Sequence, residues 1–148
     1  MTLPYERATS GDKAIGEMQK ILRTFGCTKF GYMLDDGEQS LLVQFEHRGQ
    51  QVSVKASMAG YASAWLREHP YSSRMAKTKL QHEKQAMEVA SIAVFSILRD
   101  WIKGQVMAVE TGILSFEGAF LGQILLPSGK TVLEHAQAQK LLAGPKGE

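Results

Sequence analysis

The sequence predicts an α+β domain in which a three-stranded antiparallel meander packs on helices, in the order α-βββ-α-α-α-β-α, with one long central helix. Between residues 29 and 56, apolar and polar residues alternate in three runs that are separated by short turns. The segment 89–98 is apolar on almost every side of a helix, which is typical of a helix that passes through a core. The chain has 148 residues, of which 44% are hydrophobic, so it can form one such core but not two domains of usual size.

The first helix and the meander have clear local signals. Thr9 and Asp12 have the spacing of a capping box, and Gly26 supplies the stop of the first helix. Within it, apolar residues recur at helical spacing: Ala14, Ile15, Met18, Ile21, Leu22 and Phe25. The three strands alternate through three apolar sets: Phe30, Tyr32 and Leu34; Leu41, Val43 and Phe45; Val52, Val54 and Ala56. We therefore expect one face of the sheet to be covered by helices and the other to be exposed to solvent.

Two helices are predicted after the meander. Ser57 can cap a short helix over residues 58–68, which has to stop before Pro70. Ser73 is expected to open the longest helix, which ends at Gly112.

The last part of the chain is predicted to be mostly helical. Ser115 can cap a short helix, and residues 124–126 are expected to form a short strand or extended segment. Thr131 and Glu134 form a capping box for a last helix that ends near Gly144. We expect a single domain over 1–148, divided into a core at 10–112, a C-terminal helical extension at 113–142 and a flexible tail at 143–148.

Charge and composition exclude several classes of protein. The chain holds 17 Lys and Arg against 15 Asp and Glu, so its net charge of +2 is that of neither an acidic tail nor a polybasic arm. The first residues do not form a signal or transit peptide, and no apolar run reaches the roughly 20 residues that a membrane-spanning helix needs. The sequence therefore predicts a cytoplasmic location and no membrane partner. The single cysteine, Cys27, excludes a disulfide framework, and we expect it to be a buried, inert thiol.

Signatures of enzymes are incomplete in this sequence. His82-Glu83 begins like a zinc-protease motif, but Ala86 stands where the second histidine would be. Pro127–Thr131 ends like a phosphate loop but lacks its first glycine. The four histidines fall on different elements and are expected at the surface or in partner contacts rather than as ligands. We expect no catalytic residue, no metal and no cofactor. An enzyme with an unrecognised site would need distant residues to converge, such as Arg67, His69, Tyr71, Asp100 and Glu110.

The most informative charge feature is the segment 70–84. It carries a local charge of +3, from Arg74, Lys77, Lys79 and Lys84 against Glu83. Basic residues near aromatic residues at the start of a long helix are typical of contacts with a phosphate backbone and a stacked base. The candidate nucleic-acid-binding residues are Arg67, Tyr71, Arg74, Lys77, Lys79 and Lys84. The alternative is a solvated helix start, with Trp65 and Tyr71 in the core.

The order α-βββ-α is also that of the double-stranded RNA-binding domain, in which lysines at the start of the second helix contact phosphates. The extra helix at 58–68 and the absence of a Lys-Lys-x-x-Lys pattern depart from that domain. The comparison is therefore one of topology alone.

Three segments of the chain stand out together: Lys13–Cys27, Gly60–Glu68 and Trp101–Gly129. They resemble uncharacterised small proteins from bacterial phages, prophages and other mobile elements. The resemblance implies a genetic setting and assigns a role to no residue.

Two functions are consistent with these observations. The first is a non-enzymatic nucleic-acid-binding accessory protein of a phage or mobile element, with DNA or RNA as its partner. The alternative is a protein-interaction module, such as an inhibitor of a host defence complex or a phage assembly subunit, with a host or phage protein as partner. A homo-oligomer is a further expectation, because the C-terminal part has apolar residues to bury: Phe116, Phe120, Leu121, Leu125 and Leu126.

Overall fold

The computed structural model describes residues 2–144. The order of its elements is α1 (Gly11–Thr24), β1 (Lys29–Asp35), β2 (Ser40–His47), β3 (Gln50–Ser57), α2 (Met58–Glu68), α3 (Lys79–Glu110), α4 (Phe116–Phe120), the 3-10 turn η1 (Leu121–Gln123) and α5 (Val132–Ala138). The predicted α+β class, the meander and the long central helix are confirmed.

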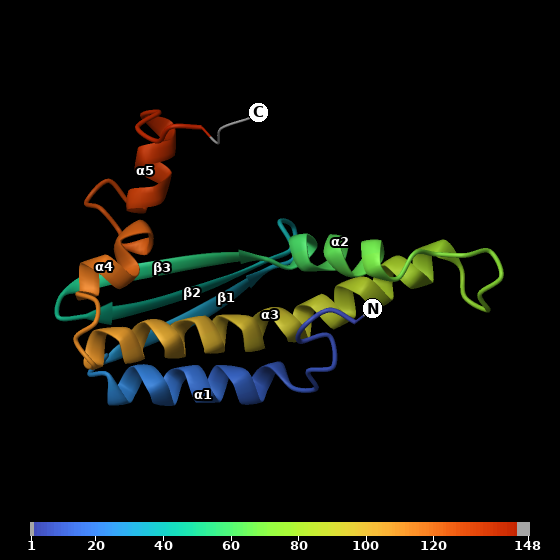
Figure 1. Ribbon diagram of the computed structural model, residues 1–148, viewed down its shortest axis with the longest axis horizontal. Helices are drawn as coiled ribbons and strands as arrows, with labels where there is room; N and C mark the ends of the chain where they lie inside the picture. Colours follow the sequence, from blue (N-terminus) through green and yellow to red (C-terminus); the bar gives the residue numbers. More distant parts are fainter. Residues whose placement is uncertain (1, 145–148) are drawn as a thin grey trace.

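The sheet has the strand order β1-β2-β3, and both pairs are antiparallel. Figure 1 shows α3 running along the sheet, with α1 beside it and α2 over its first turns. The residues of β2 and β3 that face the helices are buried, as their alternation predicts: Leu41, Val43, Phe45, Val52 and Val54.

The core lies between this sheet face and α3. On α1, Ala14, Met18 and Leu22 are spaced four residues apart and are fully buried. On α3, the buried residues recur over more than six turns, from His82 to Ala108. Phe120 of α4 closes the core from the C-terminal side and is also fully buried.

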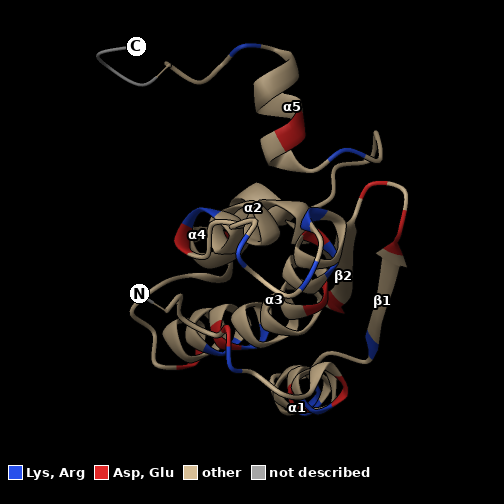
Figure 2. Ribbon diagram, turned by 90° about the vertical axis from the view of Figure 1, so that its right-hand side faces the viewer, with Lys and Arg blue, Asp and Glu red and all other residues tan. Residues whose placement is uncertain are grey.

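The expected covering of the sheet is wrong for β1. Tyr32 and Leu34 point to the helical side of the sheet, yet each is 48% exposed. Figure 2 shows the reason, because β1 lies at the outer edge of the sheet, set apart from the helices. The ring of Phe95 on α3 reaches Tyr32 edge-on, with 6.1 Å between the ring centroids.

Three helix boundaries differ from the prediction. The N-cap of α1 is Ser10 rather than Thr9, and its hydroxyl accepts the amide N–H of Lys13. The N-cap of α3 is Thr78 rather than Ser73. Helix α5 ends at Ala138 rather than near Gly144, because Lys140 adopts a left-handed backbone with φ of 54°.

The remaining caps and connections agree with the sequence. Ser57 caps α2, Ser115 caps α4, and Thr131 with Glu134 forms the predicted capping box. Residues 124–126 run as an extended segment, in which Ile124 bridges to Val52 of β3. The predicted tail from residue 145 onward lies outside the described residues. Within residues 2–144, no helix has the length and apolar character needed to cross a membrane.

Candidate functional site

The candidate cations gather at the end of the molecule where α2 leads into α3. Arg67 lies in the last turn of α2, Arg74 and Lys77 in the connecting loop, and Lys79 and Lys84 in the first turns of α3. Lys77 is half-buried and the other four are exposed. Within residues 2–144, none of the five forms an ion pair with a carboxylate. Figure 2 looks onto this end, with Lys and Arg positions in blue.

The loop that carries Arg74 and Lys77 is shaped by its own hydrogen bonds. The hydroxyl of Tyr71 donates to the backbone carbonyl of Lys77 at 3.0 Å. The carbonyl of Ser72 accepts the amide of Met75 at 3.0 Å, and its hydroxyl accepts the amide of Arg74 at 3.2 Å. These bonds hold residues 71–77 in a turn, and the helix begins only at Lys79.

The start of α3 is fixed by a capping box. The hydroxyl of Thr78 accepts the amide of Gln81, and the side chain of Gln81 accepts the amide of Thr78. The positions of Lys79 and Lys84 therefore follow from a defined helix end. The partly positive N-terminus of a 32-residue helix adds to their charge.

The aromatic residues of the site point inward. Trp65 is 4% exposed, and its ring stacks on the ring of His69 with 4.4 Å between centroids. The ring of His82 lies between Trp65 and Tyr71, at 5.1 and 5.8 Å. The alternative prediction that Trp65 belongs to the core is confirmed, and Tyr71 is half-buried. Trp65 therefore cannot stack on a base without unfolding of this end of the core.

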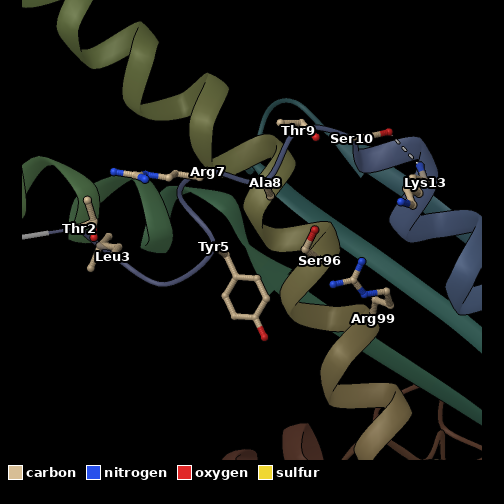
Figure 3. A pocket seen from close by; sticks show the side chains of 10 residues that line it. All are labelled: Thr2, Leu3, Tyr5, Arg7, Ala8, Thr9, Ser10, Lys13, Ser96 and Arg99. Carbon is tan, nitrogen blue, oxygen red and sulfur yellow. Dashed lines mark hydrogen bonds between the residues drawn. The ribbon is translucent and has the colours of Figure 1, made fainter.

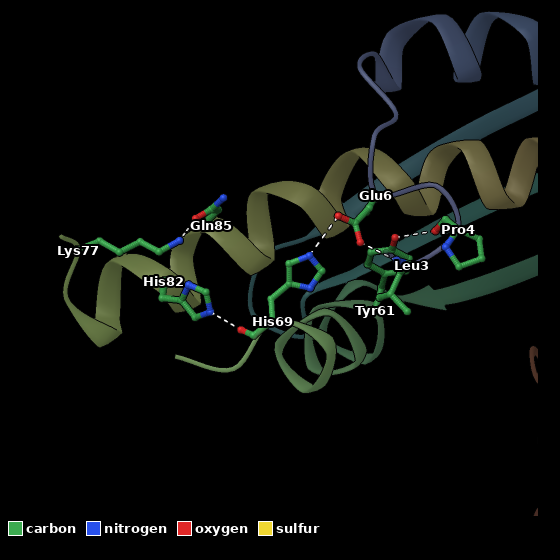
Figure 4. Close-up of polar contacts among 8 residues, drawn as sticks. All are labelled: Leu3, Pro4, Glu6, Tyr61, His69, Lys77, His82 and Gln85. Atoms are coloured by element: carbon green, nitrogen blue, oxygen red, sulfur yellow. Dashed lines mark hydrogen bonds and ion pairs between the residues drawn. The ribbon is translucent and has the colours of Figure 1, made fainter. Parts of the chain in front are cut away.

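Lys77 is held above this aromatic cluster. Its ammonium donates to the side-chain oxygen of Gln85 and lies 6.0 Å from the centre of the Trp65 ring. Figure 4 shows its side chain extended toward Gln85 on α3. Its charge is thereby positioned at the surface of the loop.

A contact that sequence reasoning missed ties the N-terminal segment to the same end. The carboxylate of Glu6 lies 3.2 Å from Nε2 of His69, and Nε2 of His82 bonds in turn to the carbonyl of His69 (Figure 4). The hydroxyl of Tyr61 donates to the carbonyl of Pro4 at 2.7 Å. Glu6 and His69 are 63 residues apart in the sequence, so no local sequence pattern predicts this contact.

A second polar region, also missed, is a cavity of about 430 Å³ between the N-terminal segment and α3 (Figure 3). Arg7, Lys13 and Arg99 contribute to its wall. Arg99 is neutralised by Asp100 at 2.9 Å and by Glu17 at 3.3 Å. Hydrogen bonds from Arg99 and from Tyr5 lower the pKa of the Asp100 carboxyl, which favours this ion pair.

The other reactive side chains that the sequence singled out are buried or far apart. Cys27 is buried, as predicted, and burial raises the pKa of its thiol to about 11. The histidines were expected at the surface or in partner contacts, but His47 and His82 are buried within this chain. Glu110 ends α3 at the opposite end from Tyr71, so the residues considered for an enzyme do not converge. Within residues 2–144, no group of three His, Cys, Asp or Glu side chains is placed to hold a metal ion.

In comparisons with protein-family models, curated proteins and solved structures, nothing matches this chain. The analogy with the double-stranded RNA-binding domain therefore rests on the order of elements alone. Helix α2, inserted between β3 and α3, is where the two topologies differ.

Proposed function

We propose that this chain is a non-enzymatic nucleic-acid-binding accessory protein of a phage or mobile element, acting in the cytoplasm. The observation that supports it is the group of five cations without carboxylate partners at one end of the molecule: Arg67, Arg74, Lys77, Lys79 and Lys84. Cations of this kind that are not neutralised by the protein can neutralise phosphates and release their counterions.

The mode of binding follows from the inward-facing aromatic residues. Because Trp65 is buried and the hydroxyl of Tyr71 is engaged with Lys77, the groups left to contact a nucleic acid are the cations and the N-terminus of α3. These groups recognise the phosphate backbone rather than base edges. We therefore propose binding to DNA or RNA with little dependence on sequence, in which Tyr71 shapes the loop rather than stacking on a base.

The test is fluorescence anisotropy of labelled single-stranded DNA, duplex DNA and duplex RNA, at about 50 and 200 mM salt. The triple variant Lys77→Glu, Lys79→Glu and Lys84→Glu should abolish the salt-sensitive binding. Substitution of the same three residues by Ala should make the negative slope of log K against log salt less steep by about 3, which is about 1 for each lost phosphate contact.

The control makes the same change of charge elsewhere. Lys20→Glu, Arg23→Glu and Lys103→Glu reverse three exposed cations that lie on α1 and on the second half of α3. This control should keep most of the binding. Equal loss in both triple variants would show that only net charge matters, and the proposed site would then be wrong.

The alternative, a protein-interaction module, is favoured by one observation on the C-terminal extension. Helix α5 contributes no buried residue and projects from the body of the molecule (Figure 1). Apolar side chains remain exposed along the extension, among them Ile113, Leu133, Leu141 and Leu142. If none of the three nucleic acids binds, a host or phage protein seated on this extension becomes the better explanation.

A further inference from the structure

Strand β1 has an open edge. The opposite edge of the sheet is partly covered, because the amide of Leu125 donates to the carbonyl of Gln51 at 2.8 Å and Ile124 bridges to Val52. Within residues 2–144, β1 pairs only with β2, through seven successive residues without a bulge. Every second residue of β1 therefore presents an unpaired backbone N–H and C=O, which is the template for adding another strand.

Large apolar side chains of β1 are exposed to solvent. Tyr32 and Leu34 are each 48% exposed on the helical face of the sheet, and Met33 is 64% exposed on the opposite face. A groove of about 410 Å³ lies on the helical side, and Tyr32, Leu34 and Phe95 form part of its wall. Natural sheets protect an open edge with charges, Pro or bulges, whereas residues 30–34 of β1 contain none of these.

The charges at the two ends of β1 match those of a second copy in one register. If two β1 strands run antiparallel with Tyr32 opposite Tyr32, Lys29 of each copy lies opposite Asp35 of the other. In the same register, Phe30 lies opposite Leu34 and Gly31 opposite Met33. A shift of two residues removes both ion pairs, and a shift of one residue places the two helical layers on opposite sides of the sheet.

We propose that β1 is a self-association edge, which pairs antiparallel with β1 of a second copy about a twofold axis at Tyr32. The product is a six-stranded sheet with both helical layers on the same side. The pairing is isologous and closes on itself, so it gives a dimer rather than a fibre. It supplies backbone hydrogen bonds to both edges and buries Tyr32 and Leu34 against apolar residues of the second copy. This proposal does not depend on the proposed function.

The experiment measures molar mass by light scattering at low and high micromolar protein. The mass should rise from the 16.3 kDa of one chain to twice that value. Lys29→Glu and Asp35→Lys should each be monomeric, because each places like charges opposite one another at both ends of the pairing. An equimolar mixture of the two variants should dimerise again, since the new glutamate of one then faces the new lysine of the other.

The mixture separates an interface effect from a folding effect. Lys29 also pairs with Glu46 at 3.0 Å, and Asp35 accepts the amide of Glu38, so each variant disturbs its own chain slightly. A folding defect would persist in the mixture, whereas loss of charge matching would be reversed. Lys20→Glu, which reverses an exposed charge on α1, is the control that should still dimerise.

Hydrogen exchange supplies a second readout that does not rely on variants. Amides of β1 that point away from β2 should become protected as the protein concentration rises, while amides of exposed loops should not change. A monomer at every concentration would overturn the proposal. So would a dimer that survives both single variants, or one in which exchange at β1 does not depend on concentration.

Discussion

His47 is an aromatic partner rather than a ligand or a surface group. Its ring stacks on Phe25 at 4.1 Å and on Phe116 at 4.9 Å, which joins α1, β2 and α4. Burial, and secondarily the charge of Arg48, lower the pKa of His47 below its ordinary value. The neutral form is therefore the one that suits the folded protein.

This burial predicts a pH dependence of stability. Because the unfolded chain binds a proton at His47 more readily than the folded chain, stability is complete above pH 6.5 and falls as the pH drops below it. His47→Phe keeps the stacking and removes this titration. Urea unfolding at about pH 7.5 and 5.5 should show wild type losing more stability than the variant over this interval. An identical loss in both would mean that His47 titrates normally in the folded state.

At the residue scale, local spacing in the sequence indicates which residues of a helix are buried, but not which distant residues they contact. Met58, Ala62 and Trp65 lie at positions i, i+4 and i+7 of α2 and are all buried, a spacing that the prediction from sequence did not use and that favours Trp65 on the buried face. The contact of Glu6 with His69 had no such signal, because it depends on how α2 and the N-terminal segment dock.

The start of α3 shows how competing local signals decide an element boundary. Both Ser73 and Thr78 are residues that can cap a helix, but Thr78 has Gln81 three residues later and so completes a capping box. The backbone near Ser73 is instead engaged by the turn of Ser72 with Arg74 and Met75. The capping-box rule, applied to Thr78 as well as to Ser73, places the boundary correctly.

Removing this cap should destabilise the protein by a moderate amount. Thr78→Ala leaves the amide of Gln81 without its acceptor and should lower the free energy of unfolding by about 1 kcal/mol. Thr24→Ala, an exposed position at the end of α1, should change it by less than about 0.5 kcal/mol. Urea unfolding of both variants measures the difference. Equal effects would show that the capping bond contributes little to the folded state.

Strand β1 shows what alternation cannot predict. The period of two placed Phe30, Tyr32 and Leu34 on one face, and that assignment is correct. Whether a helix covers that face depends on the width of the helical layer, and the residue pattern of the strand does not predict this width. The exposure of Tyr32 and Leu34 could therefore be found only from the assembled structure.

At the scale of the whole molecule, strong periodicities gave the α+β class and the order of elements. The place of the C-terminal extension was harder to predict, because its apolar residues divide between two roles. Phe120 and Ile124 are buried in the core, whereas Leu133, Leu141 and Leu142 are exposed. Short segments of similar composition carry no signal that distinguishes these two roles.

Phe120 connects the C-terminal extension to the core. Its ring packs against Phe45 of β2 at 5.5 Å and Trp101 of α3 at 5.8 Å, and it is fully buried. Phe120→Ala should therefore lower the free energy of unfolding of the whole domain by about 3–5 kcal/mol. Leu121→Ala, at a position 53% exposed, is the neighbouring control and should cost far less.

The measurement is urea unfolding followed by circular dichroism and by tryptophan fluorescence. Trp65 reports on the α2 end and Trp101 on the contact with Phe120, so fluorescence samples both ends of the core. For a single cooperative domain, the two signals should coincide in wild type and move together to lower urea in Phe120→Ala, with an unchanged m value. If the main transition stayed in place while only an early, small transition appeared, the extension would be a separate unit that merely rests on the core through Phe120.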